Sequence, residues 1–435
     1  MKKMYWSKRN YLFKSKNQDW RLYAGLSNSF FSVNEELKRK IEIFIKTNEL
    51  LFDDEILNKF IKAGVISEYT DEEFDSMYLL QWLKFQSDTS NLHLTIAPTL
   101  NCNFRCTYCY EKEKQNTKII SIDIINKIID FIKEKHPKKL EVEWYGGEPL
   151  LCIDEIKYFN EQCELNNINL CQSIITNGYL LTDEIIKYFH EKKFQQIQVT
   201  IDGDKNSHNK RRPHVSNPDS FTRIMDNLEL LYAYCSFNGY KPQVSIRVNI
   251  DRTNENDFPL IRERLYNRFG DFFYVYYGIV TDSNSCIDKA DIVFNTDDEK
   301  IYIDYLEEKY NITNQNLYPK NMNCNFCCAQ ILNSYVIDPD GYMYKCWNDI
   351  GYVERAVKKI NDKHYVNVLL ESKYLINTQV IFDKKCKDCF LLFSCQGGCP
   401  SKAINNQRYC SVIKNNIEEF LEKHFQKSKK KNFVY

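Results

Sequence analysis

The sequence lacks an excess of charge of either sign. Lysine and arginine total 59 residues and aspartate and glutamate total 59, so the formal net charge is zero. A zero balance argues against a general nucleic-acid or membrane-surface binder. The chain also lacks any uncharged apolar run near the roughly 20 residues that a membrane helix needs, and its N-terminus has no continuous apolar segment of the kind found in secretory signals. We therefore expect a cytoplasmic protein with no nucleic-acid or membrane partner.

Cysteine, by contrast, is abundant, with 17 in 435 residues. Disulfides are rare in the cytosol, so clustered cysteines there indicate metal or redox ligands. Three lie within residues 102–109 and nine within residues 324–410. The scattered ones are expected to be buried as small hydrophobes; they are Cys152, Cys163, Cys171, Cys235 and Cys286.

Residue patterns divide the chain into parts at residues 1–90, 91–285 and 286–435. In the first part, three short aromatic runs precede two helical patterns, which begin after Asn34 and Asp53. This part is either a small α+β extension or a peptide-docking module.

The second part alternates strands with helices, which indicates a parallel α/β sheet. Six strands are too few for a closed eight-stranded barrel and fit a partial barrel. Strands are expected near 93–99, 140–145, 171–176, 196–201, 243–250 and 272–279. Helices are expected near 120–135, 152–165, 182–191, 219–234 and 255–268.

The third part is dense in cysteines and turns. Pro339 presets φ and Gly341 accepts a positive φ, so we expect a hairpin between residues 334–337 and 342–344. The chain ends in a helical pattern that includes Phe420, followed by a basic tail that we expect to be solvated.

Cys102, Cys106 and Cys109 form a C-x3-C-x2-C loop directly after the first strand of the second part. Loops at the carboxyl ends of such strands hold active sites. Three thiolates can hold three irons of a 4Fe–4S cube, whereas an electron-transfer cluster normally has four cysteine ligands. The uncovered iron can bind a substrate or cofactor, as in open catalytic metal sites. A zinc site completed by a distant residue is the alternative.

This loop, with aromatic Tyr108 before its last cysteine, resembles the signature of the radical S-adenosylmethionine (SAM) enzymes. The resemblance implies that SAM chelates the open iron and that its reductive cleavage releases a 5′-deoxyadenosyl radical, which abstracts a substrate hydrogen. Gly146-Gly147-Glu148-Pro149 resembles the motif of this family that holds the SAM amino group. Further SAM contacts are implied at the ends of the following strands, at Thr176, Asn177, Thr200, Asp202 and Asn249.

A basic segment, His208 to Arg212, follows the fourth strand of this part. It resembles a histidine-to-arginine segment of peptide-modifying members of the family, and Arg212 is counted with Tyr108 among the SAM contacts. A solvated charge run is the alternative. The sequence identifies no general base.

Seven later cysteines follow the order C-x12-G-x4-C, C-x2-C-x5-C-x3-C and C, which reproduces the signature of the SPASM extension. By resemblance, one auxiliary 4Fe–4S cluster takes Cys328, Cys346 and Cys399, with Cys324 preferred over Cys327 as its fourth ligand. The other takes Cys386, Cys389, Cys395 and Cys410. A zinc ribbon is the alternative for Cys386 to Cys399.

The resemblance implies an α/β fold with a partial (β/α)6 TIM-like barrel, an N-terminal winged-helix-like α+β module and a C-terminal SPASM domain, with SAM and three 4Fe–4S clusters. SPASM enzymes mostly modify peptides, and the N-terminal part has the strand-then-helix order of leader-binding modules. We therefore expect a maturase that installs a thioether, a carbon–carbon cross-link or a related modification in a ribosomally made precursor peptide. Flavodoxin or ferredoxin is the expected electron donor.

Two other functions stay open. One is a sulfatase-maturating enzyme that oxidises cysteine or serine to formylglycine. The other is a non-enzymatic iron–sulfur electron carrier or zinc scaffold.

Overall fold

The computed structural model describes residues 3–111, 117–281, 292–313, 327–408 and 410–429. The chain forms two compact units, each built from segments that are far apart in sequence. The barrel unit comprises residues 88–311 and 332–371, and the second unit comprises residues 1–87, 312–331 and 372–435. The expected division at residues 90 and 285 follows the order of the chain and stays a prediction.

A ten-stranded sheet organises the barrel unit, in the order β11-β10-β9-β8-β7-β6-β12-β13-β14-β15. Strands β6 to β11 are parallel and alternate with helices, so the predicted α/β arrangement is confirmed. The strands are β6 (Asn91–Ile96), β7 (Lys139–Trp144), β8 (Leu170–Thr176), β9 (Gln196–Thr200), β10 (Gln243–Ile250) and β11 (Phe273–Ile279). The helices between them are α4 (Ile122–Lys135), α5 (Ile153–Leu165), α6 (Asp183–Glu191), α7 (Lys205–Arg211), α8 (Ser220–Asn238) and α9 (Asp257–Phe269).

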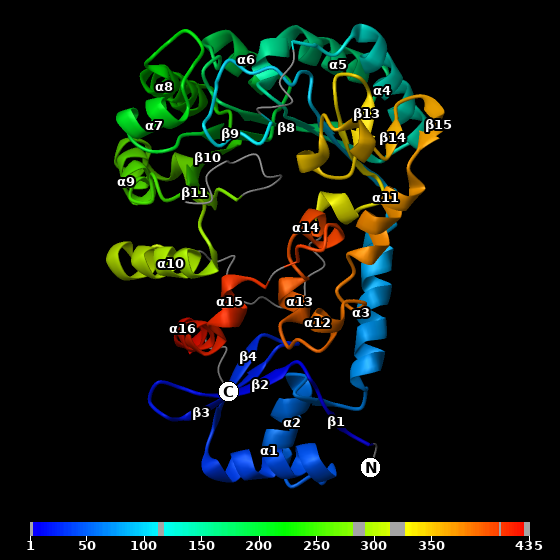
Figure 1. Ribbon diagram of the computed structural model, residues 1–435, viewed down its shortest axis with the longest axis vertical. Helices are drawn as coiled ribbons and strands as arrows, with labels where there is room; N and C mark the ends of the chain where they lie inside the picture. Colours follow the sequence, from blue (N-terminus) through cyan, green and yellow to red (C-terminus); the bar gives the residue numbers. More distant parts are fainter. Residues whose placement is uncertain (1–2, 112–116, 282–291, 314–326, 409, 430–435) are drawn as a thin grey trace. The chain divides into compact units, whose positions relative to one another are not determined.

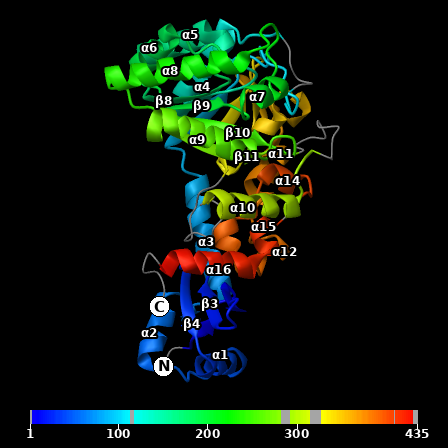
Figure 2. The ribbon, with the colours of Figure 1, turned by 90° about the vertical axis from the view of Figure 1, so that its left-hand side faces the viewer.

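The two faces of this sheet differ in polarity. In β7 and β10 every second residue is buried and apolar, such as Val142 and Ile246. Burial of such side chains against helices is the main stabilising contribution to this unit, and Figures 1 and 2 show α4, α5, α6 and α8 along this side. The alternate residues, such as Glu143 and Arg247, are only half-buried. The opposite face therefore carries the polar side chains.

The predicted hairpin at Gly341 is confirmed and extends the barrel sheet. β12 (Ser334–Ile337) pairs antiparallel with β13 (Tyr342–Tyr344) and parallel with β6. Gly341 has φ +79°, which glycine adopts without strain. The sheet ends with β14 (Lys358–Lys359) and β15 (Asp362–Val366), after which α11 covers Val368–Ser372.

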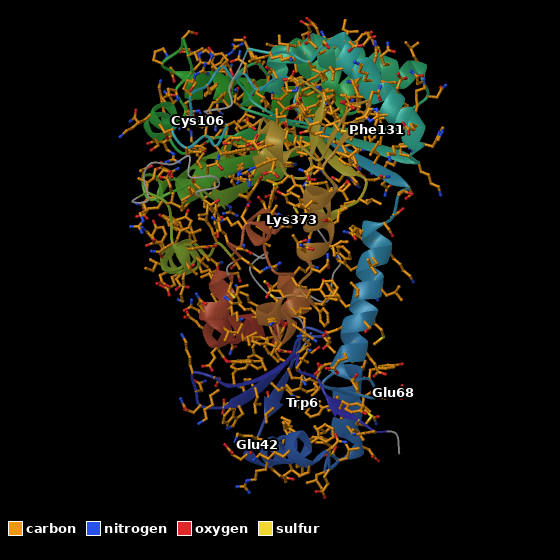
Figure 3. The ribbon with its side chains drawn as sticks, turned by 45° about the vertical axis from the view of Figure 1, so that its right-hand side comes forward. Trp6, Glu42, Glu68, Cys106, Phe131 and Lys373 are labelled. Atoms are coloured by element: carbon orange, nitrogen blue, oxygen red, sulfur yellow. The ribbon has the colours of Figure 1, made fainter. Side chains whose placement is uncertain are left out.

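The N-terminal part is an antiparallel sheet of β2 (Asn10–Lys14), β3 (Trp20–Ala24) and β4 (Ser29–Val33), followed by α1 (Glu35–Thr47) and α2 (Asp54–Lys62). The two helices begin where the patterns indicated. Asn34 and Asp53 are their N-caps, because each side chain accepts a hydrogen bond from the first turn of the helix that follows. Phe31, Phe44 and Phe60 join these elements in one apolar core, against which Trp6 packs (Figure 3). Trp6 belongs to β1 (Tyr5–Trp6), which pairs with β5 (Ile66–Ser67).

The other face of this small sheet packs against the C-terminal segment. Phe30 contacts Phe425 of the last helix, and their rings are 5.7 Å apart. Buried Arg9 donates to the carbonyl oxygens of Lys387 and Cys389 and pairs with Asp75 at 2.6 Å. The N-terminal module therefore shares its core with the cysteine-rich segment, which contains α12 (Lys384–Lys387), α13 (Leu392–Cys395), α14 (Pro400–Ile404), α15 (Val412–Asn415) and α16 (Ile417–Lys429).

Several of the described helices were not expected from the sequence. They are α3 (Asp71–Gln86), the short polar α7, α10 (Thr296–Tyr310) and the short helices α11 to α15. Nowhere in the described ranges does a helix combine the length and apolar content needed to cross a bilayer.

Candidate active site

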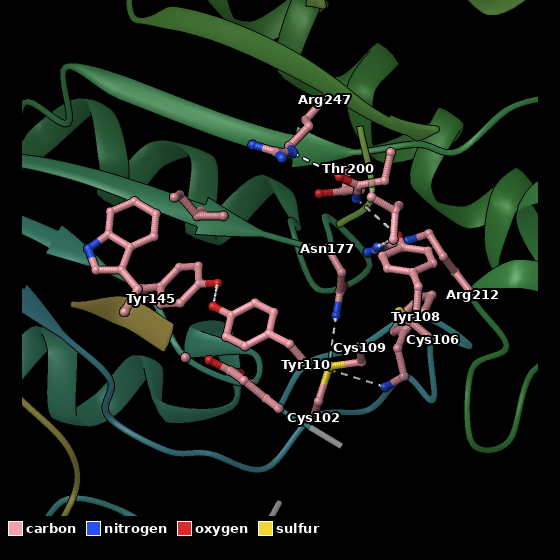
Figure 4. A pocket seen from close by; sticks show the side chains of 18 of the residues that line it. Cys102, Cys106, Tyr108, Cys109, Tyr110, Tyr145, Asn177, Thr200, Arg212 and Arg247 are labelled. Carbon is pink, nitrogen blue, oxygen red and sulfur yellow. Dashed lines mark hydrogen bonds between the residues drawn. The ribbon is translucent and has the colours of Figure 1, made fainter. Parts of the chain in front are cut away.

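A pocket of about 370 Å³ opens where the parallel strands of the barrel unit end (Figure 4). It gathers residues from the loop after β6 and from the ends of β7, β8, β9 and β10. The predicted site residues that line it are Cys102, Cys106, Tyr108, Cys109, Gly146, Gly147, Thr176, Asn177, Thr200, Arg212 and Asn249. Glu148 and Asp202 are not part of this lining.

The cysteine loop is anchored by the segment that follows α7. The Arg105 backbone N–H donates to the Pro213 carbonyl at 2.8 Å, and the Thr107 N–H donates to the Arg211 carbonyl at 2.9 Å. These two bonds fix the backbone on both sides of Cys106. The ring of Phe104, only 1% exposed, buries the beginning of the same loop. The loop is therefore held in shape by backbone hydrogen bonds to the segment at the end of α7 and by the packing of Phe104.

The three thiols are free of disulfides and face the same pocket. Burial raises the pKa of Cys102, and burial together with the Glu111 charge raises the pKa of Cys109 to about 12. Cysteine binds metals as the thiolate, so a metal that takes these ligands must offset this preference for the neutral thiol. Three soft donors in one pocket suit iron–sulfur ligation with one iron left for another ligand.

The two glycines after β7 allow that strand's loop to pass directly against the cysteine loop. The Gly147 N–H donates to the Thr99 carbonyl at 3.1 Å. A Cβ atom on Gly147 would collide with the Asn101 carbonyl oxygen and lie 2.7 Å from that of Leu100. Gly146 has φ +107°, which disfavours other residues. The glycine pair thus sets the spacing between the two loops.

Glu148 lies beneath the pocket rather than in its wall. Its buried carboxylate accepts hydrogen bonds from the Leu150 N–H, the Thr176 hydroxyl and the Asn177 N–H, at 2.7–3.0 Å. Burial raises its pKa, while these hydrogen bonds act in the opposite direction. The carboxylate joins the ends of β7 and β8, and its expected contact with a SAM ammonium group stays a prediction.

Tyr108 is the centre of a hydrogen-bond network that ties the cysteine loop to two strand ends. Its hydroxyl donates to Asp202 after β9 and accepts from Arg212 at 2.8 Å and from Asn249 at 3.0 Å. The fully buried Asp202 carboxylate also accepts from the Asn249 N–H at 3.0 Å. Four predicted contact residues therefore bond to one another, and Arg212 is buried here rather than solvated.

The end of β8 contributes Thr176 and Asn177 to the pocket. The Asn177 amide nitrogen donates to the Asn103 side-chain oxygen at 2.7 Å and lies 4.0 Å from the Cys102 sulfur (Figure 4). This bond connects a strand end with the cysteine loop directly. Thr200, at the end of β9, lines the wall nearby.

Sequence reasoning missed one side of the pocket, formed by Tyr110, Tyr145, Gln198, Arg247 and Trp347. The Tyr110 and Tyr145 hydroxyls bond to each other, and the Tyr145 and Trp347 rings are 4.9 Å apart. Two features of the sequence could have indicated this side of the pocket. Tyr110 and Trp347 each directly follow a predicted cluster ligand, and Gln198 and Arg247 are polar residues at alternating positions of strands β9 and β10.

The later cysteines are distributed over both units. Cys386, Cys389, Cys395 and Cys410, the four predicted ligands of one auxiliary cluster, line a single cavity of about 500 Å³ in the second unit. Of the other predicted set, Cys328 and Cys399 belong to the second unit and Cys346 to the barrel unit, and Cys324 lies outside the described residues. That second grouping stays a prediction.

Of the scattered cysteines, Cys152, Cys163 and Cys235 are buried, as expected. Cys171 is half-buried, and Cys286 lies outside the described residues.

Comparison with known proteins bears on this pocket directly. The model of the radical SAM superfamily matches residues 96–263, which span the cysteine loop and the four parallel strands β7 to β10. The chain contains a radical SAM domain. The family implies SAM and a 4Fe–4S cluster, and the three thiols of the pocket fit that cluster. The protein is an enzyme with radical SAM chemistry.

Two curated relatives extend beyond the radical SAM domain. The cysteine-type anaerobic sulfatase-maturating enzyme of Clostridium novyi is 26% identical over 77% of this chain and 96% of its own length. The radical SAM cyclopropyl synthase TigE of Paramaledivibacter caminithermalis is 23% identical over 94% of both chains.

Two solved structures share the fold. Native anSMEcpe, with bound AdoMet and the Kp18Cys peptide, aligns with a TM-score of 0.62 and 20% identity over 78% of this chain and 98% of its own. Streptococcus suis SuiB, bound to its precursor peptide SuiA, aligns with a TM-score of 0.52 and 16% identity over 94% of this chain and 98% of its own.

Proposed function

We propose that this radical SAM enzyme is a maturase of a ribosomally made precursor peptide. The observation that carries the proposal is the extent of the similarities. Alignment with anSMEcpe uses 98% of that chain but only 78% of this one. SuiB and TigE align over 94%. The structure of SuiB with SuiA supports a peptide substrate here.

The N-terminal module is proposed to bind the leader of that peptide. It has three antiparallel strands and packed helices. The apolar core around Phe31, Phe44 and Phe60 is formed entirely by residues 1–87. Its other sheet face is covered by Leu421 and Phe425, so this face is not available to a peptide. The module is fixed to the cysteine-rich segment through Arg9, which keeps a bound leader in a constant position relative to that segment.

In the pocket, Cys102, Cys106 and Cys109 are proposed to hold the 4Fe–4S cluster. SAM bound at the remaining iron would supply a 5′-deoxyadenosyl radical for hydrogen abstraction. Thr176, Asn177, Thr200, Arg212 and Asn249 are proposed to bind and orient SAM from the strand ends, while the surrounding rings exclude water. Asp202 is buried and is proposed to position Asn249, to whose N–H it is bonded. Glu148 is proposed to position Asn177 and, as its motif implies, to accept from the SAM ammonium group.

Two auxiliary 4Fe–4S clusters are proposed in addition. The shared cavity of Cys386, Cys389, Cys395 and Cys410 supports one of them, because four thiols at one cavity match the usual ligand set of a closed cluster. Cys328, Cys346 and Cys399 are proposed for the other, with Cys324 or Cys327 as fourth ligand. A flavodoxin or ferredoxin in the cytoplasm is the proposed electron donor.

A sulfatase-maturating activity is the second candidate, favoured by the similarity to the Clostridium novyi enzyme over 96% of its length. The first candidate installs a thioether, a carbon–carbon cross-link or a related modification, whereas this one converts a single cysteine or serine to formylglycine.

The test is anaerobic incubation of the reconstituted protein with SAM, reductant and the small peptide encoded beside the gene, followed by mass spectrometry. We expect a modified peptide, with the loss of two hydrogens for a cross-link, and no product with a peptide that lacks its leader. Cys106→Ala is the matched inactive control. An unmodified precursor together with a modified sulfatase-derived peptide would favour the second candidate.

A further inference from the structure

Arg247, on β10, occupies a place in the pocket that is built for its side chain. Its Nε atom donates to the Asn249 side-chain oxygen at 2.8 Å, and its guanidinium lies 5.9 Å from the Tyr276 ring centre. A Cβ atom on Gly278 of β11 would lie 2.7 Å from Cζ and collide with Nη2. Glycine at this position therefore leaves the space in which the guanidinium rests against β11.

The charge of Arg247 faces the pocket without a counter-charge from the described residues. Within those ranges its side chain makes no ion pair, and its hydrogen bond to Asn249 uses Nε alone. Glu111 is the carboxylate in the pocket lining, and it belongs to the cysteine loop two residues after Cys109. The terminal N–H groups of an arginine form a planar fork that suits a carboxylate.

Trp347 provides a second sign that this side of the pocket receives a ligand. Its indole nitrogen is buried, yet no described residue accepts a hydrogen bond from it. An unsatisfied buried donor lowers stability, and an acceptor on a bound molecule would offset that cost. The Trp347 ring lies 4.9 Å from that of Tyr145, so the donor is set in an aromatic wall.

We propose that Arg247 and Trp347 form a subsite for a carboxylate-bearing residue of the substrate peptide. Arg247 pairs with the carboxylate, Trp347 donates to a peptide carbonyl oxygen, and Tyr145 covers the chain between them. The inference rests on the proposed peptide substrate and specifies it as acidic near the modified residue. The carboxylate of SAM has the same chemistry. Arg212, however, lies among the residues proposed to bind SAM, and it bonds directly to Tyr108 of the cysteine loop at 2.8 Å.

The subsite is tested by calorimetric titration of the SAM-loaded, reconstituted protein with two blocked pentapeptides, Gly-Gly-Asp-Gly-Gly and Gly-Gly-Asn-Gly-Gly. We expect the aspartate peptide to bind about tenfold more tightly, which matches the lower end of the usual contribution of a hydrogen bond to a charged group. Arg247→Gln should remove this preference and Arg247→Lys should keep part of it. Trp347→Phe should weaken both peptides equally.

Two further variants separate the subsite from general damage. Gly278→Ala displaces the guanidinium without removing it and should also reduce the preference. Arg252→Gln alters an exposed arginine that pairs with Asp298 outside the pocket, so the preference should persist. SAM titrated alone should bind Arg247→Gln and the unaltered protein within about twofold.

The proposal is overturned if the unaltered protein does not distinguish the two peptides, or if Arg247→Gln still does. It is also overturned if Arg247→Gln weakens SAM binding fivefold or more in the absence of peptide, because Arg247 then serves SAM, directly or through Asn249, rather than the peptide. A precursor that stays unmodified while the aspartate preference holds contradicts the proposed function and leaves the subsite standing.

Discussion

Replacement of Gly147 by alanine should disable the cluster site through a single methyl group. The added Cβ would collide with the Asn101 carbonyl oxygen and lie 2.7 Å from the Leu100 carbonyl oxygen. Both atoms are backbone of the cysteine loop, so neither can move aside by a side-chain rotation. Overpacking of this kind costs about 1–3 kcal/mol, and the loop must shift to relieve it. Because Cys102 directly follows Asn101, the shift displaces a proposed cluster ligand.

Gly239→Ala is the matched control for this variant. Gly239 caps α8 with φ +69°, and a Cβ there has no neighbour within 4 Å. Its replacement therefore costs about 1 kcal/mol through backbone strain alone and should leave the pocket unchanged. The two variants should lose similar stability in thermal melts, but only Gly147→Ala should lose iron and SAM binding after anaerobic reconstitution. Unchanged iron content and SAM affinity in Gly147→Ala would refute the spacing argument.

Three other changes have expected outcomes. Tyr108→Phe removes the hydrogen bond to Asp202 and those from Arg212 and Asn249, and two of these three partners are charged. The free energy of unfolding should therefore fall by about 2–4 kcal/mol, and SAM should bind more weakly. An unchanged thermal melt and an unchanged SAM titration would contradict the role of this network. Burial raises the pKa of Glu143 to about 7, so the folded state retains a proton that the unfolded chain releases above about pH 4.5, and stability is lost as pH rises toward 7. Glu143→Gln should therefore stabilise by up to about 3 kcal/mol at pH 8 and have little effect at pH 4, whereas equal denaturation shifts at both pH values would count against the burial effect. Cys386→Ala should lower the measured iron content by one four-iron cluster without abolishing SAM binding, and an undiminished iron content would exclude this residue as a ligand.

The strands of the barrel and the N-terminal sheet could be predicted because their apolar residues alternate or cluster between clear turns. Helix α3 could not, because its apolar residues surround the axis: Tyr78 and Trp82 are buried while Met77, Leu80 and Leu83 are exposed. Without a single apolar face there is no helical period to recognise. The short α7 was hidden for the opposite reason, since its residues are almost entirely polar.

In the site, the cysteine loop and the glycine pair could be predicted because their spacing in sequence fixes their chemistry. Arg247 could not, because its place depends on the pairing of Asn249 with Gly278 across two strands. Glu148 was predicted at the site, but its sequence motif does not reveal that Thr176 and Asn177 surround the carboxylate. Contacts between strand ends are a property of the register, which the sequence of one strand does not contain.

The most direct test of the central claim, that three thiols hold a cluster at which SAM is cleaved, is the formation of 5′-deoxyadenosine. The anaerobically reconstituted protein should release it from SAM when reduced, and Cys106→Ala should release none. Reduced protein that carries its iron and binds SAM but forms no 5′-deoxyadenosine would contradict the account, as would a Cys106→Ala variant that cleaves SAM at the normal rate.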